Sequence, residues 1–112
     1  MSMQSTTHDL RVCTIAVPGR LDAVRAVELR ASIDEALSTG VVRFVIDLSG
    51  AEFVDSAGLA ALAKGMKDAR QRGGDLRIVR SVHADAARVF SLTRFDQVFT
   101  MGDSVDSLLG SW

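Results

Sequence analysis

An almost uninterrupted apolar run in the middle of the chain limits the fold more than any other feature of the sequence. Residues 41–48 read VVRFVIDL, with a single basic and a single acidic residue. Such a run is typical of a strand that is buried on both faces, because a strand with one solvated face alternates apolar and polar residues. Strands of this kind occur in parallel sheets that carry packed helices. The run therefore predicts an α/β fold.

The segments before this run predict one strand and one amphipathic helix. From Leu10 onward, residues 11–17 are β-branched and apolar, and Pro18-Gly19 ends the predicted strand. Asp22 is placed to cap a helix and Gly40 to stop it. The apolar residues between them recur at helical spacing: Ala26, Leu29, Ile33, Ala36 and Leu37.

The segments after the run continue the alternation. A second helix is predicted over about residues 57–72 and is closed by Gly73-Gly74. Its apolar stripe is Leu59, Leu62, Ala63 and Met66, and its outward residues are Lys64, Lys67 and Asp68. Residues 76–79 predict a strand, residues 97–99 a short strand and residues 103–109 a terminal helix. A third helix lies between the two strands, with Ser81 as its cap and with Ala86, Val89 and Phe90 facing inward.

Together these segments predict a mixed, mainly parallel sheet of four to five strands with about four helices packed on it, because alternating elements with short connections give parallel sheets. Residues 1–9 are expected to form a loose segment or a short edge strand. Residues 10–110 are expected to form one domain, since 112 residues leave no room for a second.

Composition excludes several classes of function. The formal net charge is −1, from 13 basic and 14 acidic residues that are scattered along the chain, so a nucleic-acid partner is not expected. No apolar run approaches membrane-spanning length, and the first residues lack the apolar region of a signal peptide. We therefore expect a cytoplasmic protein that does not insert into membranes. Cys13 is the only cysteine, and its apolar strand favours a buried small side chain over a reactive thiol.

Residues 50–59 are predicted to form a loop that joins the most hydrophobic strand to the second helix. Ligands and partners of open α/β sheets usually engage at the carboxyl ends of strands. Ser56 falls at or beside the start of the helix, so its hydroxyl is expected near the surface with free backbone N–H groups close by. The simpler interpretation is that Asp55 or Ser56 only caps the helix. Capping and regulation are compatible.

Enzymatic interpretations find no support in the motifs. A nucleophile elbow needs G-x-S-x-G, but Val54 stands where the first glycine should be, and His8 and His83 have no triad spacing. A phosphoaspartate receiver needs paired acids after an early strand and a late lysine, whereas no lysine follows Lys67.

A phosphate-binding G-x-x-x-x-G-K-[ST] loop is also missing from the sequence. Asp47, Glu52 and Asp55 are better explained as a solvated acidic loop than as a metal site. We therefore expect no catalytic residues, no cofactor and no metal.

Residues 45–74 (VIDLSGAEFVDSAGLAALAKGMKDARQRGG) resemble the central signature of the STAS domain family, which includes the anti-sigma-factor antagonists. The family's D-[ST]-[SA]-G motif is matched by Asp55-Ser56-Ala57-Gly58, and Gly19-Arg20-Leu21-Asp22 resembles its G-x-L-D turn. Residues 73–79 and 89–99 resemble later family segments, so the likeness covers about residues 10–109. The resemblance implies a STAS-like domain.

It also implies a function. In such antagonists the serine after the motif aspartate is phosphorylated by a partner that is both a kinase and an anti-sigma factor, and a metal-dependent serine phosphatase removes the phosphate. By position that serine is Ser56. The resemblance implies partner contacts at Asp22, Asp55, Ser56, Ala57 and Gly58. The alternative is a STAS scaffold or accessory subunit of a stress-signalling or membrane-transport complex, although a serine at the acceptor position favours the antagonist.

The chain departs from the family pattern at two positions. Many antagonists have a second serine where this chain has Ala57, and members often have glycine near Arg94. Neither departure affects the acceptor Ser56. An arginine where the family often has glycine is, however, able to change which partner is bound.

Overall fold

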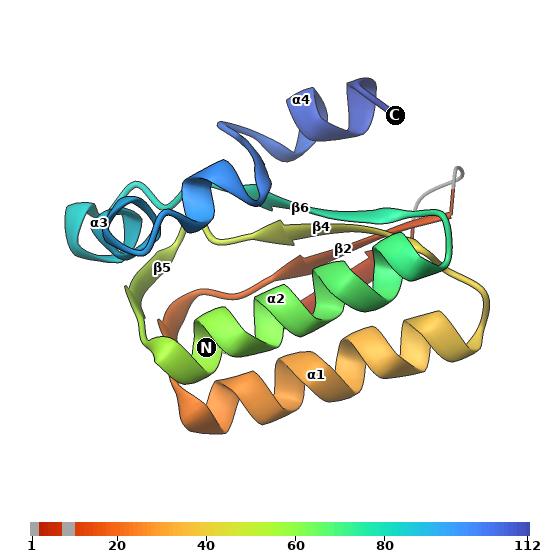
Figure 1. Cartoon of the computed structure of the whole chain (residues 1–112), viewed down its shortest axis with the longest axis horizontal. Helices are drawn as coiled ribbons and strands as arrows, with labels where there is room; N and C mark the ends of the chain where they lie inside the picture. Colours follow the sequence, from red (N-terminus) through yellow and green to blue (C-terminus); the bar gives the residue numbers. More distant parts are fainter. Residues whose placement is uncertain (1–2, 8–10) are drawn as a thin grey trace.

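A computed structural model describes residues 3–7 and 11–112, so that Leu10 and His8, two residues considered above, lie outside the described residues. Strands and helices alternate along the chain (Figure 1). Their bounds are β1 Gln4–Thr7, β2 Val12–Ala16, β3 Gly19–Leu21, α1 Ala23–Ser38, β4 Arg43–Asp47, β5 Ala51–Val54, α2 Ser56–Gln71, β6 Asp75–Val79, α3 Ala84–Leu92, the 3-10 helix η1 Phe95–Gln97, β7 Thr100–Gly102 and α4 Val105–Gly110. Within the described ranges, no helix is long and apolar enough to cross a membrane.

The main sheet is mixed and mainly parallel, as predicted. Among the described residues its strand order is β1-β2-β4-β6-β7, in which β1 is antiparallel to β2 and the other neighbours are parallel. Helices α1 and α2 lie side by side on one face of the sheet, and α4 lies on the opposite face (Figure 1). The predicted α/β fold class is confirmed.

Strand β4 is buried on both faces, as its apolar run predicted. Phe44 and Ile46 belong to the large core cluster that includes the buried residues of α1 and α2. Val45 points the other way, into a smaller cluster with Leu108 of α4. Phe44, Val45 and Ile46 are all 0% exposed. The sheet therefore needs cover on both faces, and the helices supply it.

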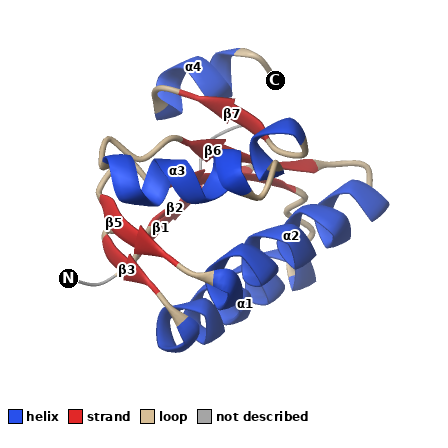
Figure 2. Cartoon of the chain, turned by 60° about the vertical axis from the view of Figure 1, so that its left-hand side comes forward, coloured by secondary structure: helices blue, strands red, loops and turns tan. Residues whose placement is uncertain are grey.

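Two strands were missed by the sequence analysis. Residues 19–22 were expected to form a turn and residues 50–59 a loop, but β3 and β5 pair in parallel as a separate two-stranded sheet (Figure 2). Gly19 N–H donates to the carbonyl of Gly50 at 3.0 Å. Strands this short carry no readable alternation, and each is stabilised by a partner that lies far away in the sequence.

The strand predicted at residues 97–99 is also wrong. The 3-10 helix η1 ends at Gln97, and β7 begins only at Thr100. The ring of Phe99 packs edge-on against Phe90 and Phe95, with centroids 6.2 and 5.8 Å apart. The apolar residue that suggested a strand is therefore a core aromatic that precedes one.

Two predicted helix starts also need correction. Ser81 does not cap α3, which begins after His83 and has no side-chain cap. The hydroxyl of Ser81 instead donates to the carbonyl of Ala51. Helix α4 begins at Val105 rather than at Asp103, because the hydroxyl of Ser104 accepts from the N–H of Ser107 at 3.1 Å.

The predicted orientation of α2 is correct for its buried side chains and wrong for Asp68. Leu59, Leu62 and Met66 are buried, and Lys64 is exposed. Asp68, expected to point outward, lies between α1 and α2 with its side chain only 16% exposed. There it pairs with two cations from the two helices, as described below.

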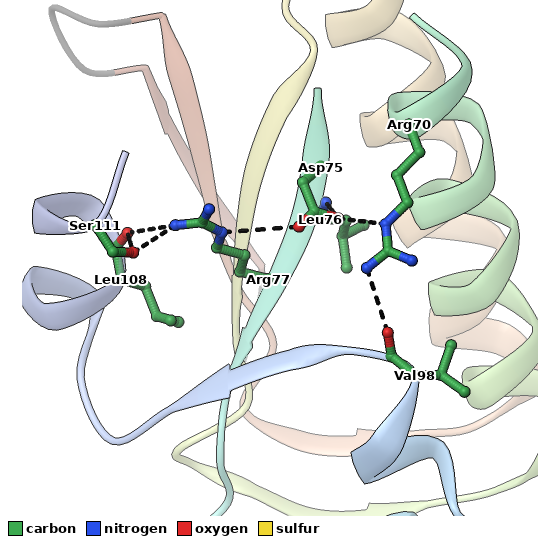
Figure 3. Close-up of polar contacts among 7 residues, drawn as sticks. All are labelled: Arg70, Asp75, Leu76, Arg77, Val98, Leu108 and Ser111. Atoms are coloured by element: carbon green, nitrogen blue, oxygen red, sulfur yellow. Dashed lines mark hydrogen bonds and ion pairs between the residues drawn. The ribbon is translucent and has the colours of Figure 1, made fainter. Parts of the chain in front are cut away.

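A chain of polar contacts links α2, β6 and α4 (Figure 3). The carboxylate of Asp75 accepts from Arg70 Nε at 2.8 Å, and its other oxygen lies 3.8 Å from Arg77 Nε. Arg77 in turn donates to the carbonyl of Leu108 at 3.3 Å, and its guanidinium stacks 3.9 Å from the ring centroid of Trp112. These contacts hold α4 on its face of the sheet.

We expect Leu62→Ala to lower the free energy of unfolding by about 2–5 kcal/mol, because Leu62 is fully buried and its removal leaves a cavity. Lys67→Ala on the exposed side of α2 is the control, and it should change stability by less than about 0.5 kcal/mol. Urea melts of both variants test the phase of α2. Equal small losses would show that the phase is wrong.

Arg94→Gly should raise the free energy of unfolding by about 1 kcal/mol. Arg94 follows α3 with φ +61°, a left-handed conformation that costs a side-chain-bearing residue energy and that glycine adopts freely. Arg72→Gly, at the end of α2 with φ −105°, is the matched control and should be destabilising. Chemical denaturation that shows the same sign for both variants would contradict the argument.

Candidate functional site

The site is built from two strand–aspartate–helix units that lie side by side. β3 and β5 run parallel, with Leu21 paired to Val54. The next residue in each unit is an aspartate that caps a long helix: Asp22 accepts from Arg25 N–H at 3.1 Å, and Asp55 accepts from Gly58 N–H at 3.0 Å. The pairing therefore places the N-termini of α1 and α2 next to each other (Figure 2).

Asp55, and not Ser56, supplies the cap of α2. Ser56 is the first residue of the helix and is exposed. Its hydroxyl thus lies at the surface, beside the positive end of the helix dipole, and takes no part in capping. The surface hydroxyl predicted at the start of the helix is therefore present, and of the two candidate caps Asp55 is the one that caps α2.

Gly58 lets α2 start close against β3. A Cβ atom at this position would lie 2.6 Å from the carbonyl oxygen of Leu21 and 2.7 Å from its Cγ. The same carbonyl accepts a hydrogen bond from Asp55 N–H at 3.3 Å. Gly58 is buried and Ala57 is half-buried, so the motif glycine serves the close packing that positions Ser56.

Charged residues of both signs lie on the two strands that lead into the site and directly after them. Glu52 is exposed on β5. On the neighbouring strand, Arg20 Nε lies 3.9 Å from a carboxylate oxygen of Asp22. The guanidinium of Arg20 also stacks 4.0 Å from the ring centroid of Phe53. The contact between Arg20 and Phe53 was not predicted, because it exists only once β3 and β5 pair. The sequence signal for that pairing was an apolar residue followed by aspartate, which occurs at residues 21–22 and again at residues 54–55.

The predicted site residues thus come together. Asp22, Asp55, Ser56, Ala57 and Gly58 all lie where β3 and β5 end and the two helices begin. Among the described residues, no group of three histidine, cysteine or acidic side chains is arranged to hold a metal ion.

Two other residues considered from the sequence lie apart from this site. Cys13 is 2% exposed and its Sγ lies 3.1 Å from Ser5 Oγ; burial raises the pKa of the thiol, against the opposing effect of the Ser5 contact. The thiol is therefore a buried side chain, as expected. His83 is exposed at the start of α3.

Comparisons with known proteins identify a family and a shared fold. The profile of the STAS domain matches residues 3–108. An anti-sigma factor antagonist from Mycobacterium paratuberculosis superposes with a TM-score of 0.85 at 28% identity, over 98% of this chain and 92% of that one. The Bacillus cell fate determinant SpoIIAA in its phosphorylated form gives 0.77 at 16% identity, over 98% of both chains. A sulfate transporter family protein from Wolinella succinogenes gives 0.78 at 17% identity, over 95% and 88%. The last two show a shared fold.

Gly58→Ala should lower the free energy of unfolding by about 1–3 kcal/mol, because the added methyl group meets backbone that has no room to move. Gly110→Ala is the control, since a Cβ there has no neighbour within 4 Å, and it should change stability by less than about 0.5 kcal/mol. Thermal and urea melts of the pair measure the difference. A loss no greater for Gly58→Ala than for Gly110→Ala would contradict the close approach of α2 to β3.

Proposed function

The chain belongs to the STAS domain family, and from this membership we propose that it is an anti-sigma factor antagonist. In its unphosphorylated form it binds a serine kinase that is also an anti-sigma factor, and phosphorylation of Ser56 releases it. The observation that carries the proposal is the placement of Ser56, which is exposed at the first position of α2 while Asp55 provides the cap. Because the Ser56 hydroxyl does not take part in the cap, a kinase can reach it without unfolding the helix.

Phosphorylation would change this surface chiefly through charge. A phosphoserine adds about −1.5 to −2 charges and three acceptor oxygens. The N-terminus of α2 favours that charge within the chain. A partner packed on Ser56 would have to remove water from the phosphate close to Glu52 and Asp55. This desolvation is costly unless the partner supplies cations that pair with the phosphate. Binding is then lost while the fold of this domain changes little.

The other predicted contacts fit the same surface. Asp22 marks the start of α1 beside Ser56, and Ala57 is partly accessible on the first turn of α2. We propose that the kinase contacts this pole of the molecule, that a serine phosphatase removes the phosphate, and that the domain acts in the cytoplasm without catalysis of its own. Gly58, which is buried, contributes by holding α2 against Leu21.

The alternative is a scaffold or accessory subunit of a stress-signalling or transport complex. A sulfate transporter family protein shares the fold of this chain, and this likeness is the support for the alternative. An exposed serine at the acceptor position favours the antagonist, since an accessory subunit does not require a phosphorylatable hydroxyl there.

We expect Ser56→Ala to bind the kinase constitutively and Ser56→Asp to bind more weakly, because only the second variant places a carboxylate where a neutral hydroxyl stood. Both variants should unfold within about 1 kcal/mol of the wild type, since Ser56 is exposed and does not cap the helix. Calorimetric titration with the cognate kinase and thermal melts test both statements. Incubation of the wild type with kinase and ATP, followed by peptide mass spectrometry, should find the phosphate on Ser56.

Ser91→Asp, an equal change of charge at an exposed serine of α3, is the control and should bind as the wild type does. Phosphate found chiefly on another serine or threonine would remove the assignment of Ser56. Equal affinities of folded Ser56→Asp and Ser56→Ala would show that charge at this position is not a switch, and would favour the scaffold function.

A further inference from the structure

An apolar groove runs between the first turns of α1 and α2, next to Ser56. Its volume is about 460 Å³. Small apolar side chains form its walls: Ala23, Ala26 and Val27 from α1, and Ala57, Ala60 and Ala61 from α2. The small side chains of the two helices leave this hollow open where α1 and α2 face each other.

The groove and the Ser56 hydroxyl share one surface. Ser56 and Ala60 are four residues apart on α2, so their side chains lie on the same face of the helix, one turn from each other. On α1, Val24 and Val27 are 72% and 71% exposed, which is unusual for two valines so close together on one helix. Of the two, Val27 forms part of the groove wall, so a partner that contacts Ser56 and the neighbouring Ala60 also lies over Val27 and the groove.

The charged side chains at the far end of the groove are neutralised within the chain. Arg30, which closes the groove, donates to Asp34 at 2.8 Å and to Asp68 at 3.3 Å. Asp68 also accepts from Lys64 at 2.7 Å, and this hydrogen bond, together with the smaller contribution of Arg30, lowers the pKa of Asp68 against the effect of burial. The groove therefore offers apolar shape and no unbalanced charge to a partner. A neutral aliphatic side chain matches it best.

We infer that this groove holds an aliphatic side chain from an amphipathic helix of the kinase partner while the kinase engages Ser56. The inference rests on the proposed function, because the approach of the kinase to Ser56 is what brings its surface over the groove. Apolar anchors from one face of a helix commonly enter grooves of this kind.

Two consequences follow for phosphorylation. The groove does not contact the phosphoryl group, so it contributes to binding of the kinase and not to the chemistry at Ser56. Loss of the groove contact should therefore raise KM for phosphorylation and leave kcat nearly unchanged, since uniform binding energy acts on KM alone.

The test uses Val27→Asp, which puts a carboxylate on the wall of the groove, and Ala60→Leu, which fills it. Leu92→Asp is the matched control, because Leu92 on α3 is 75% exposed, much as Val27 is. The cognate serine kinase is the probe. We expect the two groove variants to bind it about tenfold more weakly and to raise KM by about tenfold, with kcat within about twofold of the wild type. Leu92→Asp should behave as the wild type, and thermal melts should show all three variants folded.

Each other outcome has one meaning. Wild type that is neither bound nor phosphorylated by the kinase would remove the proposed function, and this inference with it. Normal binding and phosphorylation of the wild type, with groove variants equal to Leu92→Asp, would overturn the inference alone. A wild-type dimer in light scattering that Val27→Asp dissociates, with KM for phosphorylation unchanged, would assign the groove to a second copy of the chain and overturn the kinase as its occupant.

Discussion

The short parallel pairing of β3 with β5 is the interaction on which the functional end of the molecule depends. Each strand leads directly into an aspartate that caps a helix, so the register of the pair fixes where α1 and α2 start relative to each other. The carbonyl of Leu21 serves both units, because it accepts from Asp55 N–H and leaves space only for a glycine at position 58. The exposure of Ser56 follows from this arrangement and not from the main sheet.

Patterns that report burial were readable from the sequence, and contacts between distant segments were not. The apolar run at residues 41–48 predicted β4 correctly, because a strand that is buried on both faces is apolar at nearly every position. Asp22 was correctly predicted as a cap for the same local reason, since a cap needs only the N–H group three residues on. β3 and β5 escaped prediction because strands of three and four residues depend on each other and not on their own pattern.

The same distinction applies to the site. The exposed hydroxyl of Ser56 was predictable from its place at a helix start, whereas its proposed role as an acceptor came from the family resemblance. The stacking of Arg20 on Phe53 and the groove beside Val27 were not predictable, because both are made by segments that meet only in the fold. Asp68 shows the opposite error: helical phase placed it outward, yet two cations draw it between α1 and α2. Periodicity describes one helix at a time and says nothing of a neighbour's charges.

The tether of α4 has a consequence for how the molecule is completed during synthesis. Val45 and Val79 lie on the face of the sheet that Leu108 covers, and Arg77 reaches across that face to Leu108 and Trp112. Helix α4 follows every strand of that sheet in the chain, so it is made after them, and until it is made Leu108 cannot cover Val45 and Val79.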